Sequence, residues 1–212
     1  MIAKCRQIVR YCRASGNRRA EFLQTIRDGN KHCSSGDAIW PEPLRVIELL
    51  QEVVTRWSST FWMLDRILEL REVWYIQLDQ NYLQYLIDMI YMQPIRIFLT
   101  KYLEETQSFI LTQKEMIVLD DIVNLLDIFN TVQSLLSASK QPTLPLVIPA
   151  YEYLVHLLKH SRDHGGRRLS HAIDAALSKI NKYLPGFKLN PLYGIATGAC
   201  AFFTWHFSLT VC

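Results

Sequence analysis

The stretch that decides the fold is TRWSSTFWMLDRILEL, residues 55–70. Apolar residues recur at helical spacing from Phe61 to Leu78, so the pattern predicts a helix with one broad apolar face. Ser58 or Ser59 is expected to cap this helix, because a serine hydroxyl accepts a hydrogen bond from a free N–H group of the first turn. On its own, this pattern indicates a packed helix and no particular function.

The residues around this helix resemble a known family. Residues 55–60 with Met63-Leu64 resemble TRWNSTxxML, a signature of hAT-superfamily transposases and of their domesticated relatives, the BED-type zinc-finger proteins. Ser58 stands where that family usually has asparagine. Residues 142–149 resemble the family's PTLSxVIP segment, with Pro145 in place of serine, and residues 192–197 resemble the start of LYxIATxLDPRxK. Residues 4–9 resemble the segment that follows the family's Cys/His motif.

This resemblance implies a mainly α fold, in which a helical bundle is attached to a partial ribonuclease-H-like α/β edge. Residues 1–57 are then the partial ribonuclease-H-like region, with a strand near residues 49–54. Residues 58–187 are the all-helical insertion, and residues 188–212 are a divergent apolar tail. Periodicity by itself leaves residues 44–54 open between helix and strand.

Helical spacing predicts the remaining elements. Besides the central helix, helices are expected over residues 2–14, 18–27, 81–92, 95–105, 112–136, 146–160 and 167–184. Thr112 and Glu115 have the spacing of a capping box. Pro185-Gly186 is expected to end the last helix, because proline cannot continue the hydrogen-bond ladder.

The bulk composition favours a packed domain. Half of the 212 residues are hydrophobic, which is enough for one large core or two small ones. The net charge is +3, with basic ends around an acidic middle, so contact with a polyanion is permitted but not required. The odd number of cysteines, five, and the lack of a signal peptide predict a reducing compartment. Because no CxxC pair is present, no cysteine-based zinc finger is expected in this chain.

Arg56-Trp57 is the candidate nucleic-acid site. The resemblance implies that Trp57 lies near the family's active site and stacks on a base extruded from DNA. The alternative is that it packs at the junction between a sheet and the helical insertion. Arg6, Arg10 and Arg13, with further arginines at positions 18 and 19, are candidates for phosphate contacts, and an ordinary solvated face is the alternative.

Two clusters contain residue types that can bind metal ions, and neither is interpreted as a metal site. His156, His160 and His164 share one helical face, and two such imidazoles can hold a metal ion. A solvated last helical turn is the favoured interpretation, because the helix dipole favours histidine there. The aspartates at positions 120, 121 and 127 are interpreted as a solvated helix face. We therefore expect no metal, no cofactor and no catalytic residue.

The functional expectation is a catalytically inactive fragment of a domesticated hAT transposase, because the acidic triad implied by the resemblance falls outside this stretch. It is expected in the nucleus, in a DNA-associated or transcription-regulatory role with weak, non-specific DNA binding. The alternative is a helical module that binds a protein partner or itself, or a truncated product without function. No small-molecule substrate is expected. The charge-free tail is diluted by polar residues and glycine, so it is interpreted as a divergent exon, retained intron or shifted frame rather than a membrane anchor.

Overall fold

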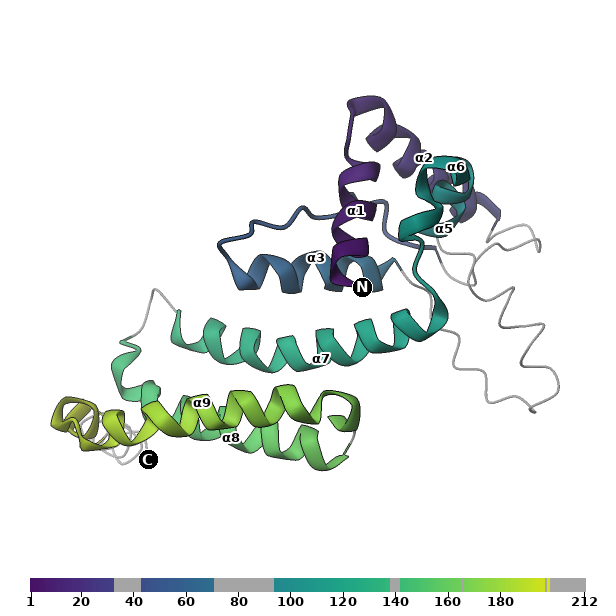
Figure 1. Cartoon of the computed structure of the whole chain (residues 1–212). Coiled ribbons are helices and arrows are strands. Elements are labelled where there is room, and N and C mark those ends of the chain that lie inside the picture. The colour runs from purple at the N-terminus through teal and green to yellow at the C-terminus, as the bar shows by residue number, and fades with distance from the viewer. Residues whose placement is uncertain (33–42, 71–93, 138–141, 165, 197, 199–212) are drawn as a thin grey trace. The chain divides into compact units, whose positions relative to one another are not determined.

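The computed structural model describes residues 1–32, 43–70, 94–137, 142–164, 166–196 and 198 (Figure 1). Most of these residues are helical, as predicted, and none of them lies in a strand. The α-helices are α1 (Ile2–Cys12), α2 (Gly16–His32), α3 (Trp57–Glu69), α5 (Pro94–Thr100), α6 (Leu103–Thr106), α7 (Gln113–Leu136), α8 (Val147–His164) and α9 (Ser170–Leu189). Short 3₁₀ turns cover Gln107–Phe109, Leu144–Leu146 and Gly166–Leu169. The helix expected over 81–92 lies outside the described residues.

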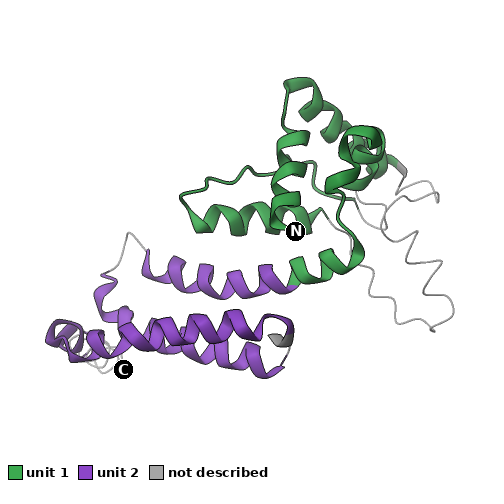
Figure 2. Ribbon diagram, in the orientation of Figure 1, with its two compact units in different colours: residues 1–120 green, residues 121–212 purple. Residues whose placement is uncertain are grey.

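The chain divides into two compact units, residues 1–120 and residues 121–212 (Figure 2). Helix α7 contributes its first two turns to unit 1 and the rest to unit 2. The expected domain boundaries at residues 57 and 187 stay predictions.

Unit 1 has a core built by α1, α2, α3 and α5. Helix α1 buries one stripe with a spacing of three to four residues, and α3 buries the face that its sequence predicts. The buried residues of these two helices are Cys5, Ile8, Val9, Cys12, Phe61, Met63, Leu64 and Ile67. Phe22 of α2 packs edge-on against Phe98 of α5, with ring centroids 5.6 Å apart. Burial on this scale stabilises each helix by more than its intrinsic propensity does.

Residues 43–53 form neither the helix nor the strand that the sequence left open, and the ribonuclease-H-like edge is not found among the described residues. A strand requires a partner strand for its backbone groups, and side chains provide those partners here instead. The Asn30 amide exchanges two hydrogen bonds with the backbone of Leu44 (2.8 and 2.9 Å). Arg66 donates to the carbonyl of Glu48 (2.9 Å). The segment is therefore held against α2 and α3 without a sheet.

Ser59 has a different role from the expected cap. Helix α3 begins at Trp57, and Arg56 precedes it without a capping hydrogen bond from a side chain. The Ser59 hydroxyl accepts from the Val53 N–H (2.8 Å) and lies 2.9 Å from the Val53 carbonyl. The Arg56 N–H also donates to Val53 O (2.8 Å). The expected serine cap was wrong because the hydroxyl instead closes the turn that leads into the helix.

The capping box at the start of α7 is confirmed. The Thr112 N–H donates to Glu115 Oε2 (2.9 Å), and the Glu115 N–H donates to Thr112 Oγ1 (3.3 Å). Lys4 Nζ lies 2.8 Å from Glu115 Oε1 and ties α1 to the same carboxylate. These hydrogen bonds, led by that from Lys4, lower the pKa of Glu115 to about 2.

Unit 2 is held together by an apolar seam between α8 and α9, which lie side by side (Figure 1), together with the unit 2 part of α7. Its buried residues are Val132, Ala150, Leu154, Leu158, Ile173, Leu177 and Ile180. Helix α9 continues through Pro185 to Leu189, so the expected end at Pro185 was wrong. Packing of Phe187 on Tyr151 (5.1 Å between ring centroids) and the Lys188–Glu152 ion pair (2.6 Å) hold the last turn against α8.

The tail is described only in part. Residues 191–196 are helical, and most of the expected divergent tail lies outside the described residues. No helix in the described part of the chain has the length and apolar character needed to cross a membrane.

Candidate nucleic-acid interface

Arg6, predicted to contact phosphates, is bound within the protein. Its guanidinium makes a two-point contact with Glu52, in which Nε meets one carboxylate oxygen and Nη2 meets the other at 2.9 Å. Glu52 also accepts from the Thr60 hydroxyl. The Glu52 side chain is only 6% exposed, whereas that of Arg6 is 40% exposed. The Arg6 hydrogen bond keeps the pKa of Glu52 below its ordinary value, which means that the ion pair persists at neutral pH.

Arg13, the residue after the last residue of α1, is engaged in the same way about two turns beyond Arg6. Its Nη1 lies 2.6 Å from Glu48 Oε2 and 2.8 Å from the carbonyl oxygen of Leu49. Seven residues of helix rise roughly 10.5 Å, and four residues of extended chain span roughly 13 Å. The two arginines and the two glutamates are therefore matched in spacing. Together they hold the extended segment antiparallel to α1.

The two arginines at the start of α2 are also partly occupied. The Arg18 guanidinium stacks over the Tyr11 ring, 3.9 Å from its centroid, and pairs with Glu105 at 3.1 Å. Arg19 is half-buried. Arg6, Arg13 and Arg18 therefore do not form a freely solvated face, because each is held by a carboxylate.

Arg10 differs from its neighbours on α1. It is exposed and forms no ion pair with a carboxylate among the described residues. Beside it lies a hollow of about 30 Å³, which is room for one water molecule, and Val54 lines that hollow with it. Arg10 is thus the residue of the α1 basic stripe that keeps its charge available to an external anion.

Arg56 and Trp57 lie at the surface, at the turn that Ser59 closes. Arg56 is exposed and has no carboxylate partner in the described part of the chain. Trp57 is 44% exposed, so its indole is not buried in a core. The junction between a strand and helices that the sequence suggested for it is absent from the described residues, because no strand precedes α3 there. The side chain instead stands half exposed at the first position of a helix.

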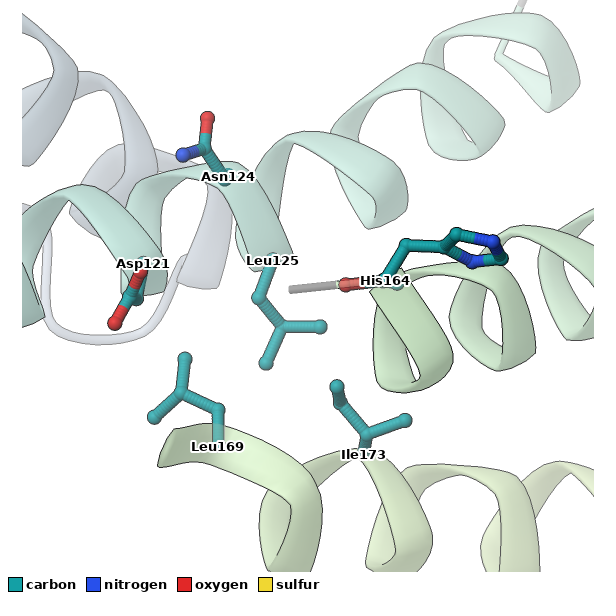
Figure 3. A pocket seen from close by; sticks show the side chains of 7 residues that line it. Asp121, Asn124, Leu125, His164, Leu169 and Ile173 are labelled. Carbon is teal, nitrogen blue, oxygen red and sulfur yellow. The ribbon is translucent and has the colours of Figure 1, made fainter. Parts of the chain in front are cut away.

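Unit 2 contains a hollow of about 260 Å³ that the sequence did not indicate (Figure 3). Leu125, Leu169 and Ile173 point toward one another there, while the Asn124 amide and the His164 ring point away. At the rim, Asp121 is paired with Arg168 (2.9 Å). The described residues contain no group of three or more His, Cys, Asp or Glu side chains placed to hold a metal ion.

Sequence reasoning missed the partners of the arginines. Glu48 and Glu52 decide which cations stay available, yet neither stands out by motif or periodicity. The only signal was the acidic character of the middle of the chain, and that character does not specify pairs.

Comparison with known proteins gives one match. Residues 1–89 match the family described as the ZBED1 RNase-like helical domain. No curated protein and no solved structure matches the chain. The match includes α1, α2 and α3, and its helical description agrees with the absence of a strand in the described part of that range. The resemblances at 142–149 and 192–197 lie outside it and stay predictions. Residues 1–89 are therefore similar to that helical domain.

Proposed function

We propose that this protein is a non-catalytic, transposase-derived nuclear protein that associates weakly and without sequence specificity with DNA. The observation that carries the proposal is the exposed Arg56-Trp57 pair, which the Ser59 turn presents at the start of α3. The similarity of residues 1–89 to a ZBED-type helical domain supports it. Arg10 supplies a further exposed cation in the same unit.

The chemistry of the pair favours unpaired bases. The Trp57 indole is 44% exposed, and stacking of a base on an aromatic side chain contributes about 1–3 kcal/mol. The neighbouring guanidinium supplies charge for a phosphate oxygen. Arg6 and Arg13 are excluded from this role while they hold Glu52 and Glu48. We therefore expect single-stranded or distorted DNA to bind better than a regular duplex.

Salt dependence tests how many cations take part. Each phosphate contact on a single strand contributes about −0.7 to the slope of log K against log salt. Arg10 and Arg56 together give about −1.4, whereas participation of Arg6 and Arg13 as well gives about −2.8. Fluorescence anisotropy of a labelled oligonucleotide, titrated at several salt concentrations, measures this slope. A slope of zero would show that the binding is not electrostatic and would overturn the proposal.

Two tryptophans of α3 provide a matched pair of variants. Trp57 and Trp62 are exposed to similar extents, 44% and 48%, and Trp62 lies five residues further along α3, where it does not adjoin Arg56. Trp57→Ala should weaken single-strand binding at least about fivefold, the equivalent of 1 kcal/mol. Trp62→Ala should leave it unchanged. Equal effects of both substitutions would contradict a specific role for Trp57.

The absence of catalysis has its own assay. Supercoiled plasmid incubated with the protein and Mg²⁺ or Mn²⁺ should stay intact. Metal-dependent nicking that disappears when acidic residues of this chain are substituted would overturn the proposal. Imaging of the full chain in cells tests the nuclear location.

A second candidate function is self-association through unit 2. Leu189, Leu192 and Ile195 are spaced three apart at the end of the described chain and are 83%, 64% and 68% exposed. Association through such residues is driven by apolar burial and persists at high salt. Sedimentation velocity at low and high salt separates it from DNA association, which salt weakens.

A further inference from the structure

The histidines of α8 form an ordered ladder rather than three independent side chains. His156, His160 and His164 are all exposed on one face of the helix. The His160 and His164 rings lie 4.1 Å apart between centroids, with planes 23° apart. The His156 and His160 rings are 6.5 Å apart. The pair at the end of the helix is therefore the closer one.

The hydrogen bonding of His164 fixes which nitrogen is available. Its Nδ1 lies 3.0 Å from the backbone carbonyl oxygen of His160. Since a carbonyl oxygen only accepts, Nδ1 carries the proton, and the lone pair of the neutral ring lies on Nε2. Donation of the other ring N–H to a carbonyl is the arrangement that orients histidine ligands in metal sites. Figure 3 shows the His164 ring directed away from the hollow of unit 2.

We propose that His160 and His164 form a two-imidazole site for a divalent transition-metal ion such as Zn²⁺ or Ni²⁺. Imidazole nitrogen suits these ions, and water fills their remaining coordination positions. Two nitrogens on a tetrahedral zinc ion with bonds of 2.0–2.1 Å lie about 3.3 Å apart. The 4.1 Å separation is between the centroids of nearly parallel rings, so both exposed side chains must rotate to turn their nitrogens toward one ion. The spacing of the three histidines in the sequence favoured a solvated helix face. The short distance between the His160 and His164 rings is the reason to propose that these two bind one ion together.

His160 and His164 are both required, because neither imidazole alone forms a chelate. His156 serves as the matched control. It has the same residue type, helix face and exposure, but it lies two turns from His164 and further from His160. His171, exposed on α9, is a control outside the ladder.

Isothermal titration with Zn²⁺ tests the site on the full chain, expressed without a histidine tag. Accessible thiols are first alkylated with N-ethylmaleimide, because thiolates bind the same ions. We expect one ion per chain at micromolar zinc. His160→Ala and His164→Ala should each weaken zinc binding at least about tenfold. Removing a group that only orients a metal ligand already lowers metal affinity about tenfold, and removing the ligand itself costs at least as much. His156→Ala and His171→Ala should bind as the wild type does.

Three results would overturn the assignment. The first is that the wild type binds no zinc at micromolar concentrations. The second is that the His160→Ala variant binds zinc as tightly as the wild type. The third is that zinc affinity falls in His156→Ala but not in His164→Ala. Circular dichroism of each variant checks that α8 stays helical. Because all three ladder histidines are exposed, their substitution by alanine should leave the fold intact.

Discussion

The buried Glu52 carboxylate affects both the stability of unit 1 and the proposed DNA association. It receives the two-point contact of Arg6 and the hydroxyl of Thr60, at an exposure of only 6%. Glu52→Gln keeps the shape of the side chain but removes its charge and turns an amide NH₂ toward a guanidinium. We expect this substitution to destabilise unit 1 and, at the same time, to free Arg6 for an external phosphate.

The expected destabilisation follows from the lost hydrogen bonds. A hydrogen bond to a charged group contributes about 1.5–3 kcal/mol. Because the Arg6 side chain is 40% exposed, water replaces part of the lost interaction, so the loss lies at the lower end. We expect about 2 kcal/mol, which lowers the urea midpoint by about 1 M at a typical denaturant slope of 2 kcal/mol/M.

Tryptophan fluorescence reports on the relevant unit, because four of the five tryptophans lie within residues 1–120. Asp28→Asn serves as the control, since Asp28 makes an exposed ion pair with Lys31 at 3.0 Å. It should leave the midpoint unchanged. In the DNA assay, release of Arg6 should steepen the single-strand salt slope by about 0.7.

The pH dependence has a defined sign. The pKa of Glu52 is lowered from 4.5 in the folded protein, so its contribution to stability is fully present above pH 4.5 and is lost as pH falls through the lowered pKa. The difference in stability between the wild type and Glu52→Gln should therefore narrow in acid. An unchanged urea midpoint at pH 7, together with an unchanged salt slope, would refute the reasoning about Glu52.

Three further predictions concern the two units. Leu158→Ala, which truncates a fully buried side chain between α8 and α9, should cost unit 2 about 3 kcal/mol and speed hydrogen exchange of residues 147–189. Pro185→Ala should stabilise α9 by about 2 kcal/mol in thermal melts followed by circular dichroism, because it restores a backbone donor inside the helix. Glu115→Gln should destabilise unit 1 by about 1 kcal/mol at pH 7 through its capping box. The pKa of Glu115 is lowered to about 2, so this difference should be lost between pH 4.5 and pH 2 in acid titrations of the urea midpoint.

Each of these predictions has a control or a contradicting result. Tyr153→Ala, on the same helix as Leu158 but 49% exposed, should have little effect on exchange. Gly186→Ala adds a methyl group that meets nothing within 4 Å, so it should stabilise α9 less, by about 1 kcal/mol. A lower melting temperature in Pro185→Ala than in the wild type would contradict this prediction. It would show that the backbone at position 185 suits proline better than alanine. A Glu115→Gln deficit that stays constant down to pH 2 would contradict the assigned pKa.

Local patterns predicted the helices well. The apolar spacing from Phe61 places the buried face of α3 correctly, and the Thr112–Glu115 spacing marks the start of α7. Both depend on interactions between residues three or four apart, which the order of amino acids fixes directly. The same local rules failed at Pro185, where aromatic packing and an ion pair to α8 keep the helix going.

The order of amino acids was enough to predict that the described part of the chain is mainly helical, where most of its helices begin and which faces they bury. The folded chain was needed to show which arginines face outward. Arg6 and Arg13 pair with Glu52 and Glu48 at separations of 46 and 35 residues, while Arg10 between them forms no direct ion pair among the described residues. Charge pairing over such separations depends on where the intervening chain runs. That path follows from burial of the whole core, and no short pattern of residues contains it.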